Sequence, residues 1–200
     1  MDAADWDRRY ADPELVWGAE PNRFVAAELA GLTPGRALDL ACGEGRNAIW
    51  LAALGWRVTA IDFSPVAVDK ARSAAQRAGV AVDWLVRDVL GYAPPPDGFD
   101  AVIVTYLHIP PAEATQVWAT AARAVGPGGT LLIIGHDRTN LTEGVGGPQD
   151  PDLLYEPDTI AAALPGLRVR RAERVRRPVP LPGGDRDAID TLVRADRDDS

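Results

Sequence analysis

Short apolar runs alternate with amphipathic stretches along most of the chain. Five runs have the length of buried strands, and they cover residues 36–40, 57–61, 81–86, 99–105 and 130–135. Between them, apolar residues recur at helical spacing, and we expect helices over residues 47–54, 65–78 and 110–125. Alternation of this kind is typical of a parallel α/β sheet with helices on its faces.

The ends of these elements carry their own signals. Ser64 and Pro65 begin the second helix as N-cap and first helical residue, and Gly79 ends it. Beyond residue 135 the pattern changes to a polar, glycine-rich loop over 136–151 and a short helix over 157–164. Two strand-like runs follow over 167–176 and 188–195. The arginine-rich residues 168–177 predict an edge strand with one solvated face, rather than a nucleic-acid patch.

Composition narrows the class of protein. Two hundred residues with 46% hydrophobic content suit one globular domain, and the net charge of −8 argues against a nucleic-acid partner. No apolar run is long enough for a membrane span, and the first ten residues lack the apolar core of a signal peptide. The single cysteine, Cys42, excludes an internal disulfide and a cysteine-based metal cluster. We therefore expect a cytoplasmic protein without a bound metal.

The most informative segment is residues 36–51, where a strand leads through a glycine-rich turn into a helix. Gly43, Gly45 and Ala48 have the spacing of the dinucleotide fingerprint. However, Asp39 and Glu44 would repel a pyrophosphate and attract a cation. S-adenosylmethionine carries an ammonium and a sulfonium group without phosphate, so we favour it over NAD. The alternatives are that Asp39 only caps the helix and that the glycines only form a tight turn.

Carboxylates also follow the next two strands. In a parallel sheet, ligands bind beyond the carboxyl ends of the strands, so Asp62 and Asp88 should join Asp39 in one crevice. Asp62 is placed to accept both ribose hydroxyls. Its alternative role as a helix cap is already filled by Ser64. Asp88 is placed to accept from the adenine amino group, with an ordinary turn aspartate as the alternative.

Three neighbouring residues complete the expected nucleoside site. The Val89 amide can address an adenine ring nitrogen, and Phe63 can stack on the purine or instead belong to the core. Thr105, at the end of the fourth strand, should lie beneath the methionine part.

At this point a family resemblance becomes specific. Asp39-Leu-Ala-Cys-Gly-Glu-Gly45, Asp62, Arg87-Asp88 and residues 99–104 and 126–129 resemble the ordered motifs of class I S-adenosylmethionine-dependent methyltransferases. Residues 43–47 and 17–22 are similar to segments of the small-molecule branch that includes tellurite-resistance and thiopurine-type enzymes. Ala41 departs from the pattern, because the family often has glycine there. The turn must avoid a positive φ at Ala41 or be strained.

The resemblance implies a Rossmann-like sheet of seven strands, mostly parallel, with helices on both faces and an antiparallel last strand beside the fifth. Residues 35–200 would form the donor-binding domain, and residues 1–34 a helical lid that belongs to the same globular unit. Asp39 and Gly43 would lie near the amino-acid part of the donor, Asp62 on its ribose and Asp88 on its adenine. The full set expected to contact the donor is Asp39, Ala41, Gly43, Arg46, Asn47, Asp62, Phe63, Asp88, Val89 and Thr105.

Methyl transfer from a sulfonium is an in-line displacement, which needs alignment and exclusion of water. A base is needed only for an acceptor that keeps its proton near neutral pH. His108 and His136 follow the fourth and fifth strands and are the candidates, with Asp137 placed to orient His136. Each histidine has the alternative role of a polar loop residue or substrate contact.

A lid over the acceptor is expected from the N-terminal aromatic residues and the glycine-rich loop. The predicted substrate contacts are Tyr10, Trp17, Asn22, Asp137 and Arg138, with Trp6 and Asn140 as further lid residues. The alternative for the aromatic residues is simple packing against the sheet.

The sequence thus predicts methyl transfer to a small-molecule acceptor with release of S-adenosyl-L-homocysteine, by a monomer or homodimer. An NAD-dependent oxidoreductase and a non-catalytic S-adenosylmethionine-binding module are the alternatives. The acceptor atom is not specified by these residues.

Overall fold

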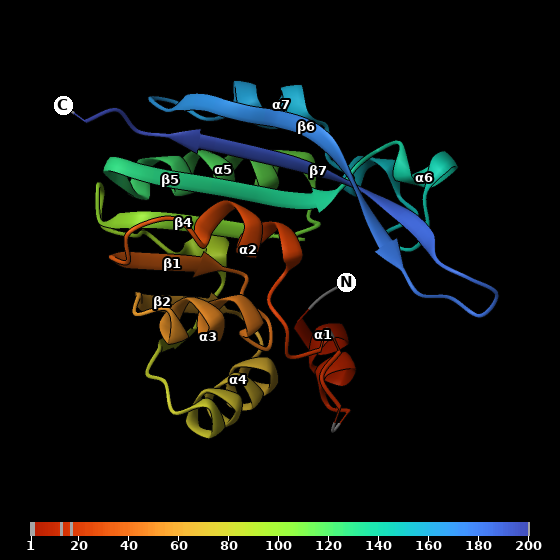
Figure 1. Ribbon diagram of the computed structural model, residues 1–200, viewed down its shortest axis with the longest axis horizontal. Helices are drawn as coiled ribbons and strands as arrows, with labels where there is room; N and C mark the ends of the chain where they lie inside the picture. The colour runs from red at the N-terminus through yellow and green to blue at the C-terminus, as the bar shows by residue number, and fades with distance from the viewer. Residues whose placement is uncertain (1–2, 13, 17, 200) are drawn as a thin grey trace.

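A computed structural model describes residues 3–12, 14–16 and 18–199 of the chain. Seven strands form one sheet in the order β3-β2-β1-β4-β5-β7-β6 (Figure 1). The first five strands run parallel, and β7 lies antiparallel between β5 and β6. The strands are β1 (Arg36–Leu40), β2 (Arg57–Asp62), β3 (Asp83–Val86), β4 (Phe99–Thr105), β5 (Val125–His136), β6 (Arg168–Val179) and β7 (Arg186–Asp196). The predicted fold, with its antiparallel strand beside the fifth, is confirmed.

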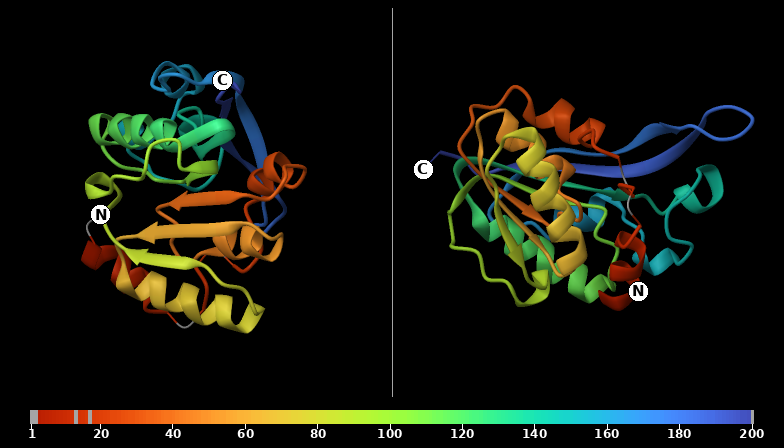
Figure 2. Two further views of the ribbon diagram at one scale, coloured as in Figure 1. Left: turned by 90° about the vertical axis from the view of Figure 1, so that its left-hand side faces the viewer. Right: turned by 90° about the horizontal axis from the view of Figure 1, so that it is seen from below.

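Helices cover both faces of the sheet (Figures 1 and 2). On one face α2 and α3 contribute Val25, Leu29 and Leu51 to an apolar cluster with the sheet. On the other face α5 contributes Val117 and Trp118 to a second cluster. The helices are α1 (Ala3–Tyr10), α2 (Arg23–Leu29), α3 (Arg46–Ala53), α4 (Pro65–Ala78), α5 (Pro111–Ala124), α6 (Asn140–Glu143) and α7 (Pro157–Ala162), with short 3-10 turns η1 (Val89–Gly91) and η2 (Pro151–Leu153). Burial on both faces explains why the central strands are almost wholly apolar.

The predicted helix signals hold in detail at α4. The Ser64 hydroxyl accepts from the Ala67 amide at 3.1 Å, Pro65 opens the helix, and Gly79 ends it with a φ of 69°. Most differences lie at boundaries, but α6 forms within residues 136–151, which were predicted to be a loop. The third strand begins at Asp83 rather than residue 81, and the fifth begins at Val125 because its first residue already pairs with the start of β4.

The last two strands are longer than predicted and form a hairpin that projects beyond the sheet (Figures 1 and 2). As expected, β6 is an edge strand. Its arginines make ion pairs such as Arg168 with Asp198, Arg170 with Asp196 and Arg176 with Asp187. Charged side chains of this kind discourage the pairing of an exposed edge with another chain.

The parallel strands point toward the side of the molecule where α1 and α6 lie (Figure 1). The carboxyl ends of β1, β2, β4 and β5 and the N-terminal segment therefore meet at one edge of the sheet. In the part of the chain that the structure describes, no helix has the length and apolar character needed to cross a membrane.

Candidate active site

The turn after β1 forms a tight concave backbone. Ala41, Gly43 and Gly45 all have positive φ, at 58°, 55° and 78°, and α3 begins at the next residue, Arg46. Glycine adopts this conformation freely, but a residue with a Cβ does so at an expense of about 1–2 kcal/mol. Of the two possibilities raised by the sequence at Ala41, the structure shows the strained one.

Asp39 lies at the bottom of this turn. Its side chain is completely buried, and neither carboxyl oxygen makes a well-formed hydrogen bond within the described residues. Burial, and next the nearby charge of Asp62, raise the pKa of Asp39 from 3.8 to about 8, against smaller opposing effects of Arg46 and the Ala48 amide. A buried carboxyl group without a partner is rare in folded proteins and indicates a missing cation or donor.

Asp62 ends β2 beside the same turn. Its two oxygens accept from the backbone amides of Gly43 at 2.8 Å and Ser64 at 3.0 Å. Burial raises the pKa of Asp62, although these two amide donors lower it. Each carboxylate oxygen has a second lone pair, so the side chain can still accept from a ligand. Asp62 therefore shapes the glycine turn as well as lining it.

Phe63, Asp88, Val89 and Thr105 lie at the carboxyl ends of β2, β3 and β4, as predicted, but they differ in their exposure and contacts. Asp88 is exposed and accepts from the Leu90 amide at 2.9 Å, so it caps η1 as a turn aspartate does. Val89 is buried in the core, and Phe63 is half-buried. The Thr105 hydroxyl accepts from the Asn47 side chain at 3.3 Å.

The glycine turn over residues 41–45, with Asp39 and Asp62, forms a niche, and Glu44 does not face it in the way the sequence suggested. Its carboxylate lies 2.6 Å from the Lys70 ammonium and accepts from the Val16 amide at 2.9 Å. Its charge is thus neutralised by α4, so the expectation that Glu44 attracts a cationic ligand is wrong. The acidic character of the niche comes from Asp39 and Asp62.

The N-terminal segment covers the glycine turn. Tyr10 is buried, and a Cβ added to Gly43 would lie 2.9 Å from the Tyr10 hydroxyl. The Lys70 ammonium donates to the carbonyls of Tyr10 at 3.2 Å, Asp12 at 2.8 Å and Glu14 at 2.7 Å. Lys70 therefore ties this segment to α4. Trp17, predicted to contact the substrate, lies outside the described residues.

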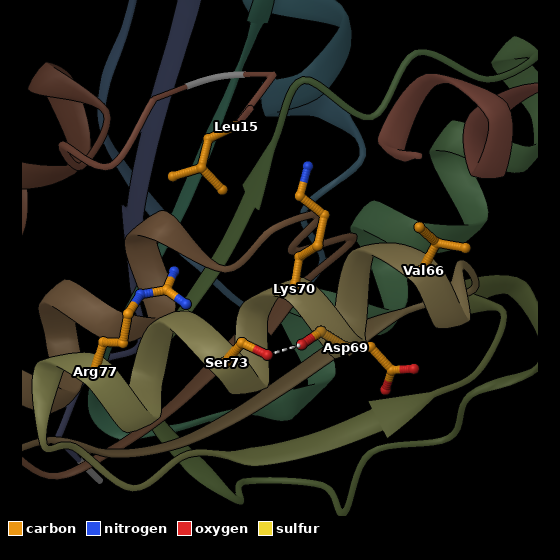
Figure 3. Close-up of a pocket in the computed structure, with 6 residues that line it drawn as sticks. All are labelled: Leu15, Val66, Asp69, Lys70, Ser73 and Arg77. Atoms are coloured by element: carbon orange, nitrogen blue, oxygen red, sulfur yellow. Dashed lines mark hydrogen bonds between the residues drawn. The ribbon is translucent and has the colours of Figure 1, made fainter. Parts of the chain in front are cut away.

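Figure 3 shows Lys70 extending from α4 toward the segment that carries Leu15. The hollow drawn there, about 440 Å³, is also lined by Asp69, Ser73 and Arg77 on the outer side of α4. It therefore lies apart from the carboxylates of the niche.

Asn22 and Asn47 connect the N-terminal segment to the sheet. The Asn22 amide donates to the Asn47 side chain at 2.8 Å, and the Asn22 side chain caps α2 and donates to the Tyr106 hydroxyl at 3.3 Å. Both asparagines are buried. Arg46 is half-buried, and burial lowers its pKa. Asn22 and Asn47 thus hold the elements around the site in place.

The two histidines lie together, with ring centroids 5.4 Å apart. Nδ1 of His108 lies 2.7 Å from the Leu153 carbonyl, and Nε2 accepts from the His136 backbone amide at 3.3 Å. Burial lowers the pKa of His108 to about 4. Because both ring nitrogens of His108 are engaged, its ring supports His136 and does not present a free base.

His136 faces a buried carboxylate that the sequence did not suggest. His136 and Asp190 are directly opposite in the pairing of β5 with β7, and Nδ1 of His136 lies 3.2 Å from Oδ1 of Asp190. The other oxygen of Asp190 accepts from the Tyr106 hydroxyl at 2.7 Å and from Nε of Arg177 at 2.8 Å. Tyr106 itself has a positive φ of 55°, a strained backbone conformation of the kind that clusters at functional sites.

Asp137 does not orient His136, so this expectation is wrong. Its oxygens accept from the side chains of Thr139, Thr191 and Arg174. Successive residues of a strand point to opposite faces, so the neighbour of His136 in sequence turns away from it. The neighbouring loop residues show the same division. Arg138 is exposed, whereas Asn140 is buried and accepts from the Ile189 amide at 2.7 Å.

In open α/β sheets, ligands bind beyond the carboxyl ends of the strands, which is where the glycine turn and the unpartnered Asp39 lie. Residues 37–129 match the family described as Methyltransferase domain. This stretch, just under half of the chain, is therefore similar to methyltransferase domains.

Curated relatives match over part of the chain. The ubiquinone biosynthesis O-methyltransferase of Xanthomonas campestris pv. campestris (strain B100) is 38% identical over 119 residues, 58% of this chain and 48% of that protein. The chain thus spans about half the length of the curated relatives it matches.

Solved structures share the fold over the whole chain. TehB from Haemophilus influenzae superposes with a TM-score of 0.73 and 16% identity, covering 96% of this chain and 65% of that one. The N-methyltransferase NodS from Bradyrhizobium japonicum WM9, in complex with S-adenosyl-L-homocysteine, gives 0.72 and 18%, covering 98% and 97%.

Proposed function

We propose that this protein transfers a methyl group from S-adenosyl-L-methionine to a small-molecule acceptor. The observation that carries the proposal is Asp39, a buried carboxyl group with no well-formed hydrogen bond under a strained, glycine-rich turn. A carboxyl group of this kind fits the ammonium of the donor, which would supply both the charge and the hydrogen-bond donors that Asp39 lacks. The donor itself supplies an electrophilic methyl group on a sulfonium.

The neighbouring residues fit the remaining parts of that molecule. Asp62 keeps free lone pairs for the ribose hydroxyls while its amide contacts hold the turn in shape. Asp88 and the Val89 amide would address the adenine edge, and Phe63 its ring face. Ala41, Gly43, Arg46 and Thr105 would line the amino-acid end, whereas Asn47 acts through Asn22 and Thr105.

The protein's part in catalysis is alignment and exclusion of water. Lys70 and Glu44 hold the N-terminal segment, including Tyr10, over the turn. The acceptor would enter between this segment and the cluster that contains Tyr106 and His136. A small-molecule acceptor is supported by the similarity to the ubiquinone biosynthesis O-methyltransferase. From the sequence we also propose that the protein is cytoplasmic and that it is a monomer or a homodimer.

Calorimetry with S-adenosyl-L-homocysteine tests the proposal. We expect binding by the wild-type chain and a loss of about 1.5–3 kcal/mol, or roughly ten- to a hundredfold in affinity, for Asp62→Ala and for Asp39→Ala. Asp100→Asn, at the opposite edge of the sheet, is the matched control because its carboxylate contacts only the Arg36 amide in the described residues. Unchanged affinity in both site variants would refute the site. Binding without turnover on any acceptor would instead favour the non-catalytic module.

A further inference from the structure

His136 is held in one orientation on all sides. The His108 ring stacks on it at 5.4 Å, and the Tyr106 ring meets it at 5.1 Å and 62°. Gly147 lies against the ring so closely that a Cβ there would come within 2.7 Å of Cδ2. A ring fixed in this way has lost its rotational freedom before any ligand binds, which favours a positioned catalytic group.

The two ring nitrogens of His136 have different environments. Nδ1 and the facing oxygen of Asp190 are buried and lie 3.2 Å apart as an ion pair, and neither atom makes a well-formed hydrogen bond in the described part of the chain. Nε2 makes no hydrogen bond to any described residue. An ionised carboxylate only accepts hydrogen bonds, so Asp190 requires the proton on Nδ1 and leaves the lone pair on Nε2.

Asp190 is kept ionised by groups from three elements. Burial opposes its ionisation, but the contact with His136 and the hydrogen bonds from Arg177 and Tyr106 lower its pKa overall. The charged or titratable groups that face the pair are thus Arg177 from β6, and Tyr106 and His108 after β4. Burial raises the pKa of Tyr106, so its hydroxyl stays protonated and donates to Asp190.

We propose that His136, oriented by Asp190, is the general base of the reaction and that the acceptor is a phenolic or enolic hydroxyl. This inference rests on the proposed methyl transfer. A thiolate or a metalloid anion already has a free electron pair near neutral pH, and a positioned base would add nothing. An imidazole can deprotonate a phenol, whose pKa is about 10, far more readily than a hydroxyl as weakly acidic as water at about 16.

The acceptor oxygen gives its proton to Nε2 of His136 and forms a bond to the methyl carbon. The bond between that carbon and sulfur breaks, and its electron pair stays on sulfur, giving the methyl ether and S-adenosyl-L-homocysteine. His136 then releases the proton to water. Asp190, Tyr106 and Arg177 are positioning residues, because each acts through His136.

The tautomer of His136 can be measured directly, because the chain has only two histidines. We expect nitrogen-15 spectra of the wild-type protein to show His136 protonated on Nδ1, and Asp190→Asn to move that proton toward Nε2. Asp187→Asn is the matched control, because Asp187 also lies on β7 and pairs with an arginine of β6, Arg176, but is only half-buried. A proton on Nε2 in the wild-type protein would overturn the proposal whatever the variants do.

Turnover tests the acceptor class. With catechol as the methyl acceptor we expect His136→Asn to lower kcat by about a hundredfold or more, with unchanged affinity for S-adenosyl-L-homocysteine. Asp190→Asn should lower kcat in the same direction, and Asp187→Asn should leave it unchanged. With thiophenol, which ionises without help, His136→Asn should retain any turnover that the wild-type protein shows.

Methylation of thiophenol but not of catechol or resorcinol by the wild-type protein would overturn the inference, as would full catechol turnover by His136→Asn. Calorimetry with S-adenosyl-L-homocysteine on the same samples separates the two claims. Retained binding with no hydroxyl methylation removes only the assignment of the acceptor. Absent binding removes the proposed function itself.

Discussion

Replacing Asp39 with asparagine should change the pH dependence of stability and weaken donor binding together. The pKa of Asp39 is raised from 3.8 to about 8, chiefly because burial opposes ionisation and also because Asp62 is near. The folded protein therefore keeps a proton that the unfolded chain loses above its own pKa. The contribution of Asp39 to the free energy of unfolding is complete below the pKa that this group has in the unfolded chain. It falls as the pH rises toward the pKa that the group has in the folded protein.

The magnitude follows from the two pKa values. From about pH 5 to about pH 8, ionisation of this one carboxyl group should remove roughly 3–4 kcal/mol from the free energy of unfolding. Asp39→Asn lacks the ionisable proton, so its unfolding free energy should fall less steeply over the same range. Urea unfolding at several pH values measures this slope, with Asp100→Asn as a control that should keep the wild-type slope.

The same substitution should reduce affinity for S-adenosyl-L-homocysteine by about ten- to a hundredfold, the usual effect of losing a charged hydrogen-bond partner. In the wild-type protein the ammonium must displace the Asp39 proton, so affinity should rise by up to about tenfold per pH unit toward pH 8 and then level off. Identical stability slopes in wild-type and Asp39→Asn proteins would refute the assignment of the perturbed carboxyl group. A donor affinity independent of pH would refute its pairing with the ammonium.

Two other predictions concern the surroundings of the niche. Lys70→Met should speed release of S-adenosyl-L-homocysteine by about tenfold, because three carbonyl contacts and the Glu44 ion pair are lost. Stopped-flow measurements give the release rate, with Arg72→Met on the outer face of α4 as the control. Equal release rates in the two variants would contradict the prediction. Ala41→Gly should raise the free energy of unfolding by up to about 1 kcal/mol by relieving the positive φ, whereas Ala74→Gly inside α4 should lower it by about 1 kcal/mol. Chemical denaturation decides this pair, and destabilisation by both substitutions would remove the strain argument.

Local signals explain why so much of the fold was predictable. Apolar runs buried on both faces specify the central strands. Ser64 and Pro65 specify where α4 begins, and Gly79 specifies where it ends. The strand-end rule likewise brings Asp39 and Asp62 to one edge without any knowledge of the structure. These inferences depend on residues close together in the chain.

The parts that failed depend on distant contacts. Asp190 lies opposite His136 only through the register of β7 against β5, and the nearest sequence signal is a single carboxylate within an apolar run. Asp137 was favoured for the same role because it is adjacent in sequence, although strand geometry turns it to the other face. The neutralisation of Glu44 by Lys70 depends in the same way on the packing of α4 beside the turn.

A crystal structure of the protein with S-adenosyl-L-homocysteine tests the central claim most directly. The ammonium of the ligand is expected against Asp39 and its ribose hydroxyls against Asp62, beneath the N-terminal segment that Lys70 secures. A crystal in which the ligand is bound elsewhere, with Asp39 still lacking a partner, would contradict the account.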